Sequence, residues 1–387
     1  LESEVRSYAR NFPRLFKRAQ GEFIYDEDGN EYIDFLAGAG ALNYGHNHPV
    51  MRTKLMEYIE SGGITHSLDL YTDAKRDYME TFREKILRPR NYDYTLMFTG
   101  PTGTNAVEAS LKIARKITGR SHVLSFTNGW HGQTLGSLSM TANSHHRDGA
   151  GIALTGAHRV PYDGYLGDEI DTTEYIDKVL SDSSSGVDLP AAAIVETIQG
   201  EGGVNYCSME WLKRLAEVCK KHGVLLIVDD IQAGCGRSGR FFSFEEAGIQ
   251  PDIVTLSKSM SGYGLPFAMI MLKPELDQWK PGEHNGTFRG NNHAFVTAKA
   301  AIDTYWSDDS FAESVRKKGE YIAKRLDDIV DQYGEDNFSV KGRGMFQGIN
   351  CVNGEIANKI TRAAFQKGLI IETSGSDDHI IKLLCPL

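Results

Sequence analysis

Short aliphatic runs, each followed by small polar residues, recur through the middle of the chain. The clearest run covers residues 224–228 and ends at Asp229, and a second run at 253–256 is followed by Lys258. Unbroken apolar runs of this length are typical of parallel strands that are covered on both faces. The pattern therefore predicts an α/β protein with a buried, mostly parallel central sheet.

Strand, loop and helix alternate from about residue 50 to about residue 290, and the character of the chain changes afterwards. Further strands are expected at 94–98, 121–126 and 191–195, and helices at 105–117 and 211–222. Beyond residue 293, helices are expected at 294–305 and 310–333, with short strands at 346–350, 369–372 and 380–384. A hairpin is expected at 21–35 with its turn at Asp28-Gly29, whereas 38–49 is too rich in glycine for a regular element. We predict a large domain at 46–293 and a smaller α+β domain built from 1–45 and 294–387.

Five of the expected strands are followed by polar or aromatic side chains. These are Thr104, Trp130, Glu196, Asp229 and Lys258. Open α/β sheets bind ligands at the carboxyl ends of their strands, so we expect these groups to converge on one edge. Trp130, flanked by glycines, fits either a plug in the core or a surface that stacks on a flat ring.

A lysine and an aspartate at the ends of two buried strands suit pyridoxal phosphate. The amine of Lys258 can form a Schiff base with the aldehyde, while Asp229 keeps the pyridine nitrogen protonated. Gln232 can bond the phenolic oxygen, and the loop at 99–104, which opens a helix, suits the phosphate. A buried Asp–Lys ion pair without a cofactor is the alternative.

The composition restricts the class of protein. The 387 residues carry a net charge of −10 without a basic block, which argues against nucleic acid and membrane surfaces as partners. The five cysteines are scattered, and the chain has neither a signal-peptide core nor an apolar run long enough for a membrane span, so we expect free thiols in the cytoplasm. No metal is expected, because His46 and His48 lack companion ligands. The chain stops directly after a strand-like run, so a further C-terminal segment is an open expectation.

At these residues the chain resembles the class III aminotransferases of pyridoxal-phosphate fold type I. The resemblance covers essentially the whole chain and is carried by FLAGAG (35–40), GPTGTNAVEA (100–109), VDDIQAGCGR (228–237), GTFRG (286–290) and IKLLCPL (381–387). It implies that Lys258 binds the cofactor aldehyde, Asp229 the pyridine nitrogen, Gln232 the phenolic oxygen, Trp130 the ring face, and Gly103 and Thr104 the phosphate. It further implies a homodimer, or a dimer of dimers, in which Thr287 completes the phosphate site of the neighbouring subunit.

The positions implied for the substrate depart from the pattern of the class. Glu201 would lie near a substrate carboxylate, but Gln133 and Lys382 stand where many class III enzymes have arginine. Those arginines bind carboxylates through two parallel hydrogen bonds, which neither glutamine nor lysine reproduces. The residues that hold the substrate carboxylates are therefore left open.

The resemblance implies a ping-pong transamination. Glutamate would donate its amino group, leaving 2-oxoglutarate, and L-aspartate 4-semialdehyde would accept it, giving L-2,4-diaminobutyrate in the first committed step of ectoine biosynthesis and osmoadaptation. Another ω-aminotransferase reaction, on acetylornithine, ornithine or 4-aminobutyrate, is the alternative within the class. A cofactor-binding regulator without turnover is the alternative outside it, and the lack of an added DNA-binding segment weighs against that reading.

Overall fold

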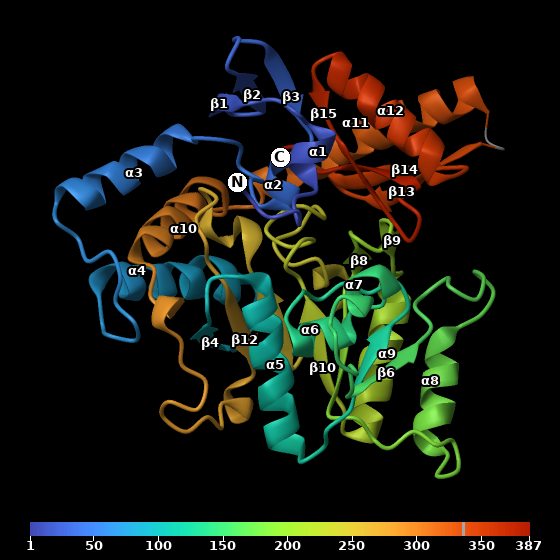
Figure 1. The fold of residues 1–387 in the computed structure, drawn as a ribbon. Helices are drawn as coiled ribbons and strands as arrows, with labels where there is room; N and C mark the ends of the chain where they lie inside the picture. Colours follow the sequence, from blue (N-terminus) through green and yellow to red (C-terminus); the bar gives the residue numbers. More distant parts are fainter. Residues whose placement is uncertain (335–336) are drawn as a thin grey trace.

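The computed structural model describes residues 1–334 and 337–387, and they form two regions (Figure 1). The lower region in that view is a seven-stranded sheet between helices. The upper region holds two smaller sheets and the helices at the C-terminal end of the chain.

The central sheet has the strand order β4-β12-β11-β10-β7-β5-β6. Its strands are β4 (Thr95–Phe98), β5 (Val123–Phe126), β6 (Ala157–Val160), β7 (Ala192–Val195), β10 (Leu225–Asp229), β11 (Ile253–Leu256) and β12 (Met269–Leu272). Only β12 runs antiparallel to its neighbours β4 and β11, so the expectation of a mostly parallel sheet is confirmed.

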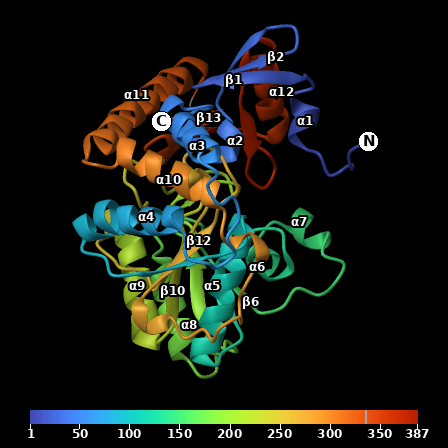
Figure 2. The same cartoon turned by 90° about the vertical axis from the view of Figure 1, so that its left-hand side faces the viewer.

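Helices cover both faces of this sheet. α5 (Gly103–Thr118) packs on one face, whereas α4 (Asp73–Phe82), α9 (Met209–His222) and α10 (Asn292–Tyr305) pack on the other (Figure 2). Within β10, Ile227 faces α5 while Leu226 and Val228 face the opposite side. The unbroken aliphatic run of β10 follows from this double cover, because the side chains of Leu226, Ile227 and Val228 are buried, at roughly 1.5–3 kcal/mol each.

The upper region joins the two ends of the chain. One sheet has the order β1-β2-β3-β15, and the other β13-β14-β17-β16. Their strands are β1 (Phe16–Gln20), β2 (Phe23–Asp26), β3 (Glu31–Asp34), β13 (Phe338–Arg343), β14 (Phe346–Cys351), β15 (Leu369–Ile370), β16 (Glu372–Ser374) and β17 (Ile380–Leu383), and α11 (Ser310–Tyr333) and α12 (Gly354–Gln366) pack beside them. The β2–β3 hairpin and the helices α10 and α11 match the expected ranges within about two residues. The exact domain limits at 46 and 294 stay a prediction.

The remaining helices are short or lie at the edges of the fold. They are α1 (Tyr8–Asn11), α2 (Ala37–Gly40), α3 (Pro49–Glu60), α6 (Leu135–Met140), α7 (Ser144–Asp148) and α8 (Thr172–Ser181). The helical turn α2 lies where no regular element was expected, although Gly38 and Ala39 inside it have φ of 62° and 56°. The segment is therefore an irregular turn, in which Gly38 adopts the left-handed backbone freely and Ala39 adopts it at a cost in free energy. The edge strand β6 was not expected either, because its Ala-His-Arg-Val sequence has no apolar run.

Candidate active site

A pocket of about 190 Å³ lies at the carboxyl ends of the central strands. Its walls bring together most of the side chains that the sequence singled out. They include Gly103, Thr104, Trp130, Glu196, Glu201, Asp229, Gln232 and Lys258. The predicted convergence at one edge of the sheet is therefore observed.

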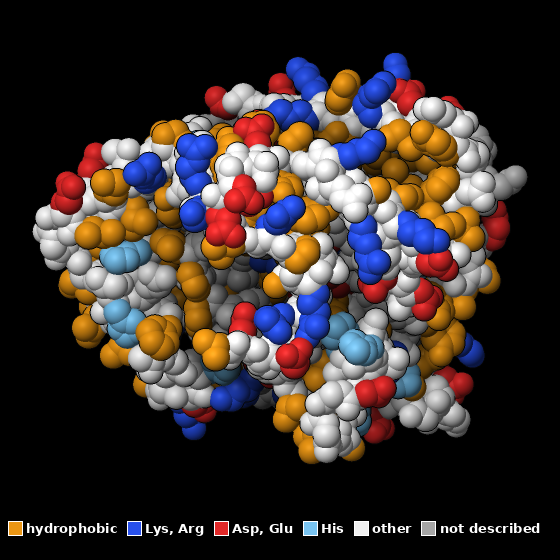
Figure 3. Space-filling view, turned by 45° about the horizontal axis from the view of Figure 1, so that its top comes forward, with side chains coloured by type: hydrophobic (Ala, Val, Ile, Leu, Met, Phe, Trp, Pro, Cys, Tyr) orange, Lys and Arg blue, Asp and Glu red, His pale blue; other side chains and the backbone are white. Residues whose placement is uncertain are grey.

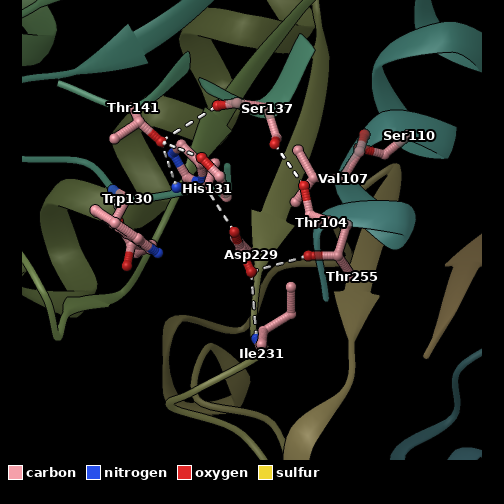
Figure 4. Close-up of polar contacts among 12 residues, drawn as sticks. Thr104, Val107, Ser110, Trp130, His131, Ser137, Thr141, Asp229, Ile231 and Thr255 are labelled. Carbon is pink, nitrogen blue, oxygen red and sulfur yellow. Dashed lines mark hydrogen bonds and ion pairs between the residues drawn. The ribbon is translucent and has the colours of Figure 1, made fainter. Parts of the chain in front are cut away.

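Asp229, the last residue of β10, is held by two side chains. His131 Nδ1 lies 2.7 Å from Asp229 Oδ2, and Thr255 Oγ1 donates to Asp229 Oδ1 at 3.0 Å (Figure 4). The carboxylate is 5% exposed and His131 only 3%. These contacts fix the orientation of the carboxylate while one side of it faces the pocket.

Lys258 lies across the same pocket and does not pair with Asp229. Its Nζ donates instead to the carbonyl oxygen of Ala39 at 2.8 Å. Among the described residues, no ion pair joins Lys258 to Asp229, so the alternative of a structural Asp–Lys pair is wrong. A space lined by both groups remains between amine and carboxylate.

The backbone and the burial of Lys258 distinguish it from a surface lysine. Its φ of 49° is the left-handed conformation, which costs a residue with a side chain about 1–3 kcal/mol. Burial lowers the pKa of the Lys258 amine, and the charge of Glu201 offsets part of that effect. The turn at 37–43 holds the segment in place, because Ser259 Oγ donates to the carbonyl of Gly40 at 2.8 Å.

A cradle of small and hydroxyl residues surrounds the start of α5. Thr104 Oγ1 lies 2.8 Å from Thr134 Oγ1 and 2.5 Å from Ser137 Oγ. A Cβ added to Gly132 would lie 2.5 Å from Thr104 Oγ1, so no side chain fits there. The free amide groups of the first turn of α5, the positive end of its dipole and these hydroxyls suit a phosphate.

Trp130 is half-buried and forms a wall of the pocket, so it is not a core plug. Its backbone N–H donates to Glu196 Oε2 at 2.8 Å. Burial and then the neighbouring Asp229 raise the pKa of Glu196 well above its usual value. The indole packs edge-on against His146, with 4.4 Å between ring centroids. Both contacts fix the loop that presents the indole to the pocket.

At the other end of the pocket, Glu201 accepts hydrogen bonds from the side chains of two other segments. Lys382 Nζ donates to Glu201 Oε1 at 2.7 Å, and Gln232 Nε2 donates to the same oxygen at 3.2 Å. Burial alone would raise the pKa of Glu201, but Lys382 and Lys258 outweigh it and lower the pKa to about 2. Lys382 itself is fully buried and also lies 3.1 Å from Glu372 Oε1.

Three predicted residues do not line the pocket: Lys382 lies behind Glu201, and Gln133 and Thr287 lie farther away on the surface. Gln133 is exposed, and its Nε2 lies 3.1 Å from His146 Nδ1. Thr287 is exposed in the short helical turn Thr287–Arg289. Neither contributes a wall to this pocket within a single chain.

Three side chains of the site were missed by the sequence reasoning: His131, Thr255 and Glu372. His131 directly follows Trp130 in the loop after β5, and β10, which ends in Asp229, lies two strands away in the same sheet with β7 between them. Glu372 lies in the run Leu-Ile-Ile-Glu and faces Lys382 in the run Ile-Ile-Lys-Leu-Leu. Opposite charges in two otherwise apolar strands were a signal for a buried pair.

The residues present fit pyridoxal phosphate. The pocket offers a carboxylate for a protonated ring nitrogen, an indole beside the ring, a phosphate cradle and a buried amine for the aldehyde. These four groups lie at or just after the ends of four strands, β10, β5, β4 and β11, and reach one another only through the fold.

Fold and site together define a pyridoxal-phosphate-dependent aminotransferase of fold type I. The chain belongs to the class III aminotransferase family, since the family model "Aminotransferase class-III" matches residues 5–387. The family implies pyridoxal phosphate as the cofactor.

Curated relatives match over the whole length of the chain. A diaminobutyrate–2-oxoglutarate transaminase of Bordetella parapertussis is 56% identical over 385 residues, which is 99% of this chain and 88% of the relative. The transaminase of the same name from Halomonas elongata is 55% identical and is covered to 93% by this chain, whose whole length matches. An uncharacterized aminotransferase of Sinorhizobium fredii is equally similar, at 56% identity over 387 residues.

Solved structures agree on the fold. The ornithine aminotransferase of Toxoplasma gondii superposes with a TM-score of 0.84 at 27% identity, over 99% of this chain and 87% of that one. An S-selective transaminase of an Arthrobacter species reaches a TM-score of 0.87 at 21% identity, over 100% of this chain and 91% of that one. The second likeness concerns the fold alone.

Other expectations have simple structural outcomes. All five cysteines are buried and free, as predicted. His46 Nε2 lies 2.7 Å from Asp34 Oδ2, and His48 Nε2 lies 2.7 Å from the hydroxyl of Tyr305, so both rings serve local contacts. None of the helices within 1–334 and 337–387 combines the length and the apolar character needed to cross a membrane. Acidic and basic side chains are interspersed over the face seen in Figure 3.

Proposed function

We propose that the protein transfers the amino group of L-glutamate to L-aspartate 4-semialdehyde, giving L-2,4-diaminobutyrate and 2-oxoglutarate. The pocket shared by Lys258 and Asp229 carries the reaction class. The substrates are supported by the name of the curated relatives, which are 55–56% identical across the chain.

Pyridoxal phosphate would be held at both ends. Gly103 and Thr104 would bind the phosphate at the start of α5, and Asp229 would pair with the ring nitrogen. Gln232 would bond the phenolic oxygen, and Trp130 would stack on the ring. When bound, the cofactor carries the amino group between substrates and withdraws electrons from the reacting carbon.

Lys258 would move the proton. Its Nζ would take a proton from the substrate carbon that bears the amino group, and would later return a proton. A neutral amine is needed for this step, and burial favours it because the pKa of Lys258 is lowered. Only Ser257 separates Lys258 from the end of β11, and Lys258 adopts a left-handed backbone there. The amine therefore enters the pocket from the end of the strand.

Asp229 would stabilise positive charge on the ring nitrogen. An opposite charge within a few ångströms raises the pKa of such a nitrogen, and His131 and Thr255 keep the carboxylate from turning away. The site thereby strengthens electron withdrawal at the moment when the proton leaves the substrate.

Two features support a dimer with a shared site. Thr287 points outside its own pocket, and the side chains of Tyr71 and Phe288 are 99% and 64% exposed. The exposed Phe288 directly follows the predicted phosphate-binding Thr287, and large exposed apolar side chains fit a surface covered by a second copy of the chain. We propose that Thr287 of each subunit completes the phosphate site of the other.

Product analysis tests the proposed reaction. The protein, loaded with pyridoxal phosphate, is incubated with glutamate and aspartate 4-semialdehyde, and the products are identified by mass spectrometry. Equimolar diaminobutyrate and 2-oxoglutarate are expected. Parallel reactions with 2-oxoglutarate and either ornithine, acetylornithine or 4-aminobutyrate as donors test the alternative, and a preference for one of them over diaminobutyrate would contradict the assignment.

A further inference from the structure

Lys382 is a buried cation between two carboxylates. Its Nζ lies 2.7 Å from Glu201 Oε1 and 3.1 Å from Glu372 Oε1. The side chain of Lys382 is 0% exposed, that of Glu372 5% and that of Glu201 27%. One lysine therefore has two counter-charges of different accessibility.

The two carboxylates also differ in how firmly the surrounding backbone holds them. Glu372 lies on β16 directly opposite Lys382 on β17, as a cross-strand pair of an antiparallel ladder. Glu201 lies in the turn after β8 (Ile198–Gln199) and lines the pocket beside Lys258. A loop residue facing a cavity can move away, whereas a buried strand residue is fixed by its ladder. Glu201 is thus the exchangeable partner and Glu372 the permanent one.

A substrate carboxylate needs a cation at this end of the pocket. Lys258 is the only lysine or arginine among the described residues that line it, and its amine is engaged in the chemistry. The next cation is Lys382, immediately behind Glu201. A carboxylate of the amino donor can reach Lys382 only if Glu201 gives up its place.

Removing Glu201 from a lysine that has no other partner would leave a buried, uncompensated charge. Such a charge costs several kcal/mol, so the open state would be scarcely populated. Glu372 can supply the missing compensation. Its Oε1 is buried and has no hydrogen-bond partner among the described residues, although Lys382 lies within ion-pair distance.

The electrostatics are consistent with an exchange of partners. Burial raises the pKa of Glu372, Lys382 opposes this effect, and the charge of Glu201 raises the pKa further. When Glu201 moves away, that repulsion disappears and the negative charge on Glu372 becomes more favourable. The ammonium, with three rotatable donors, can then turn toward Glu372 without losing its place.

We propose that Glu372 is a positioning residue that keeps Lys382 charged and in place while a substrate carboxylate displaces Glu201. The inference rests on the proposed use of glutamate as amino donor. The ammonium of Lys382 can divide its three donors between a fixed and an exchangeable carboxylate.

Single-turnover spectroscopy of the loaded protein tests this role. Glu372→Gln keeps the size of the side chain and removes its charge. The second-order rate constant for conversion of the bound cofactor to its aminated form by glutamate should fall about 10-fold or more. The reason is that Lys382 loses its remaining counter-charge when Glu201 is displaced. Conversion by diaminobutyrate, which can proceed with Glu201 still on Lys382, should change less than about 2-fold, a factor that corresponds to only ~0.4 kcal/mol.

Two further variants make the result decisive. Glu372→Asp keeps the charge and should restore most of the glutamate rate. Glu355→Gln removes an exposed carboxylate that is also paired with a lysine, Lys359 at 2.6 Å, and should leave both rates unchanged. An unchanged glutamate rate in Glu372→Gln, or an equal loss with both donors, would overturn the inference. A wild-type protein that does not react with diaminobutyrate would contradict the proposed function, while the glutamate rate would still test Glu372.

Discussion

At the scale of single residues, the site depends on charges that the fold holds in unusual surroundings. Asp229 is buried at a strand end but faces a space rather than a cation. Lys258 is half-buried and adopts a left-handed backbone. Both groups have hydrogen-bond partners among the described residues but form no ion pair with each other across the pocket, so we expect them to serve a ligand rather than the stability of the fold.

Replacing Asp229 by asparagine tests the first of these charges. The amide side chain of Asp229→Asn could keep one hydrogen bond with His131 or Thr255 but would carry no charge opposite the ring nitrogen. We expect the turnover rate to fall by about 100-fold or more, with the protein still folded and loaded. Steady-state kinetics and the cofactor absorbance measure both properties, and an unchanged rate would remove the role assigned to Asp229.

The neighbouring residue, Asp230, predicts a pH effect on stability. It is 1% exposed, and burial raises its pKa to about 7, although two hydrogen bonds from Ser243 oppose the shift. The folded pKa lies above the unfolded value, so this group favours the folded state fully below about pH 4 and loses its contribution as the pH rises through 7.

Urea unfolding of the cofactor-free protein between pH 5 and 8 measures this effect. The free energy of unfolding of the wild type should fall relative to Asp230→Asn by roughly 3 kcal/mol between pH 5 and pH 8. Asp182→Asn, which changes an exposed carboxylate, should run parallel to the wild type. Parallel curves for the wild type and Asp230→Asn would contradict the raised pKa.

At the scale of elements, the sequence predicted most of the central sheet because most of its strands have their own apolar run, which the edge strand β6 lacks. The run at 224–228 and the helix at 105–117 both lie within about two residues of β10 and α5. Contacts between elements were not predictable in the same way. The pairing of Asp229 with His131, and that of Lys382 with Glu372, depends on which strands become neighbours, and that order is set by the packing of the whole sheet.

The phosphate cradle is an arrangement of two loops and one helix end, and Gly132 is its tightest point. With a φ of 133° and Thr104 Oγ1 in the place of a side chain, Gly132→Ala would push the cradle open. We expect the dissociation constant for pyridoxal phosphate to rise by about 10-fold or more, since roughly 1–3 kcal/mol of strain falls on this contact.

Gly29→Ala is the matched control for this change. Gly29 also has a positive φ, of 85°, but a Cβ there would meet nothing within 4 Å. This variant should lose some stability without a change in cofactor affinity. Equal cofactor affinity in both variants, measured by fluorescence titration, would contradict the role of this cradle in binding the phosphate of the cofactor.

At the scale of the whole molecule, residues from both ends of the chain close over the site. Ala39 near the N-terminus accepts the hydrogen bond of Lys258, and Lys382 near the C-terminus reaches Glu201. Such contacts link segments far apart in the sequence and leave no local pattern, so only the resemblance to a family suggested Lys382. For the same reason the role of Thr287 stays a prediction, because it concerns a second copy of the chain.

Mixing two impaired variants tests whether subunits share their sites. Lys258→Ala abolishes the amine, and Thr287→Val weakens phosphate binding. If Thr287 serves the neighbouring subunit, a mixed dimer regains one intact site. About a quarter of the wild-type activity should then return after denaturation and refolding together, since roughly half of the dimers are mixed. No recovery beyond the separately refolded variants would show that Thr287 acts within its own chain or not at all.

The most direct test concerns the bond between Lys258 and the cofactor aldehyde. Borohydride reduction of the loaded protein, followed by digestion and mass spectrometry, identifies the lysine that carries the pyridoxyl group. The account predicts a single modified residue, Lys258, and no stable modification in Lys258→Ala. A pyridoxyl group on another lysine, such as Lys382, with Lys258 unmodified would contradict it.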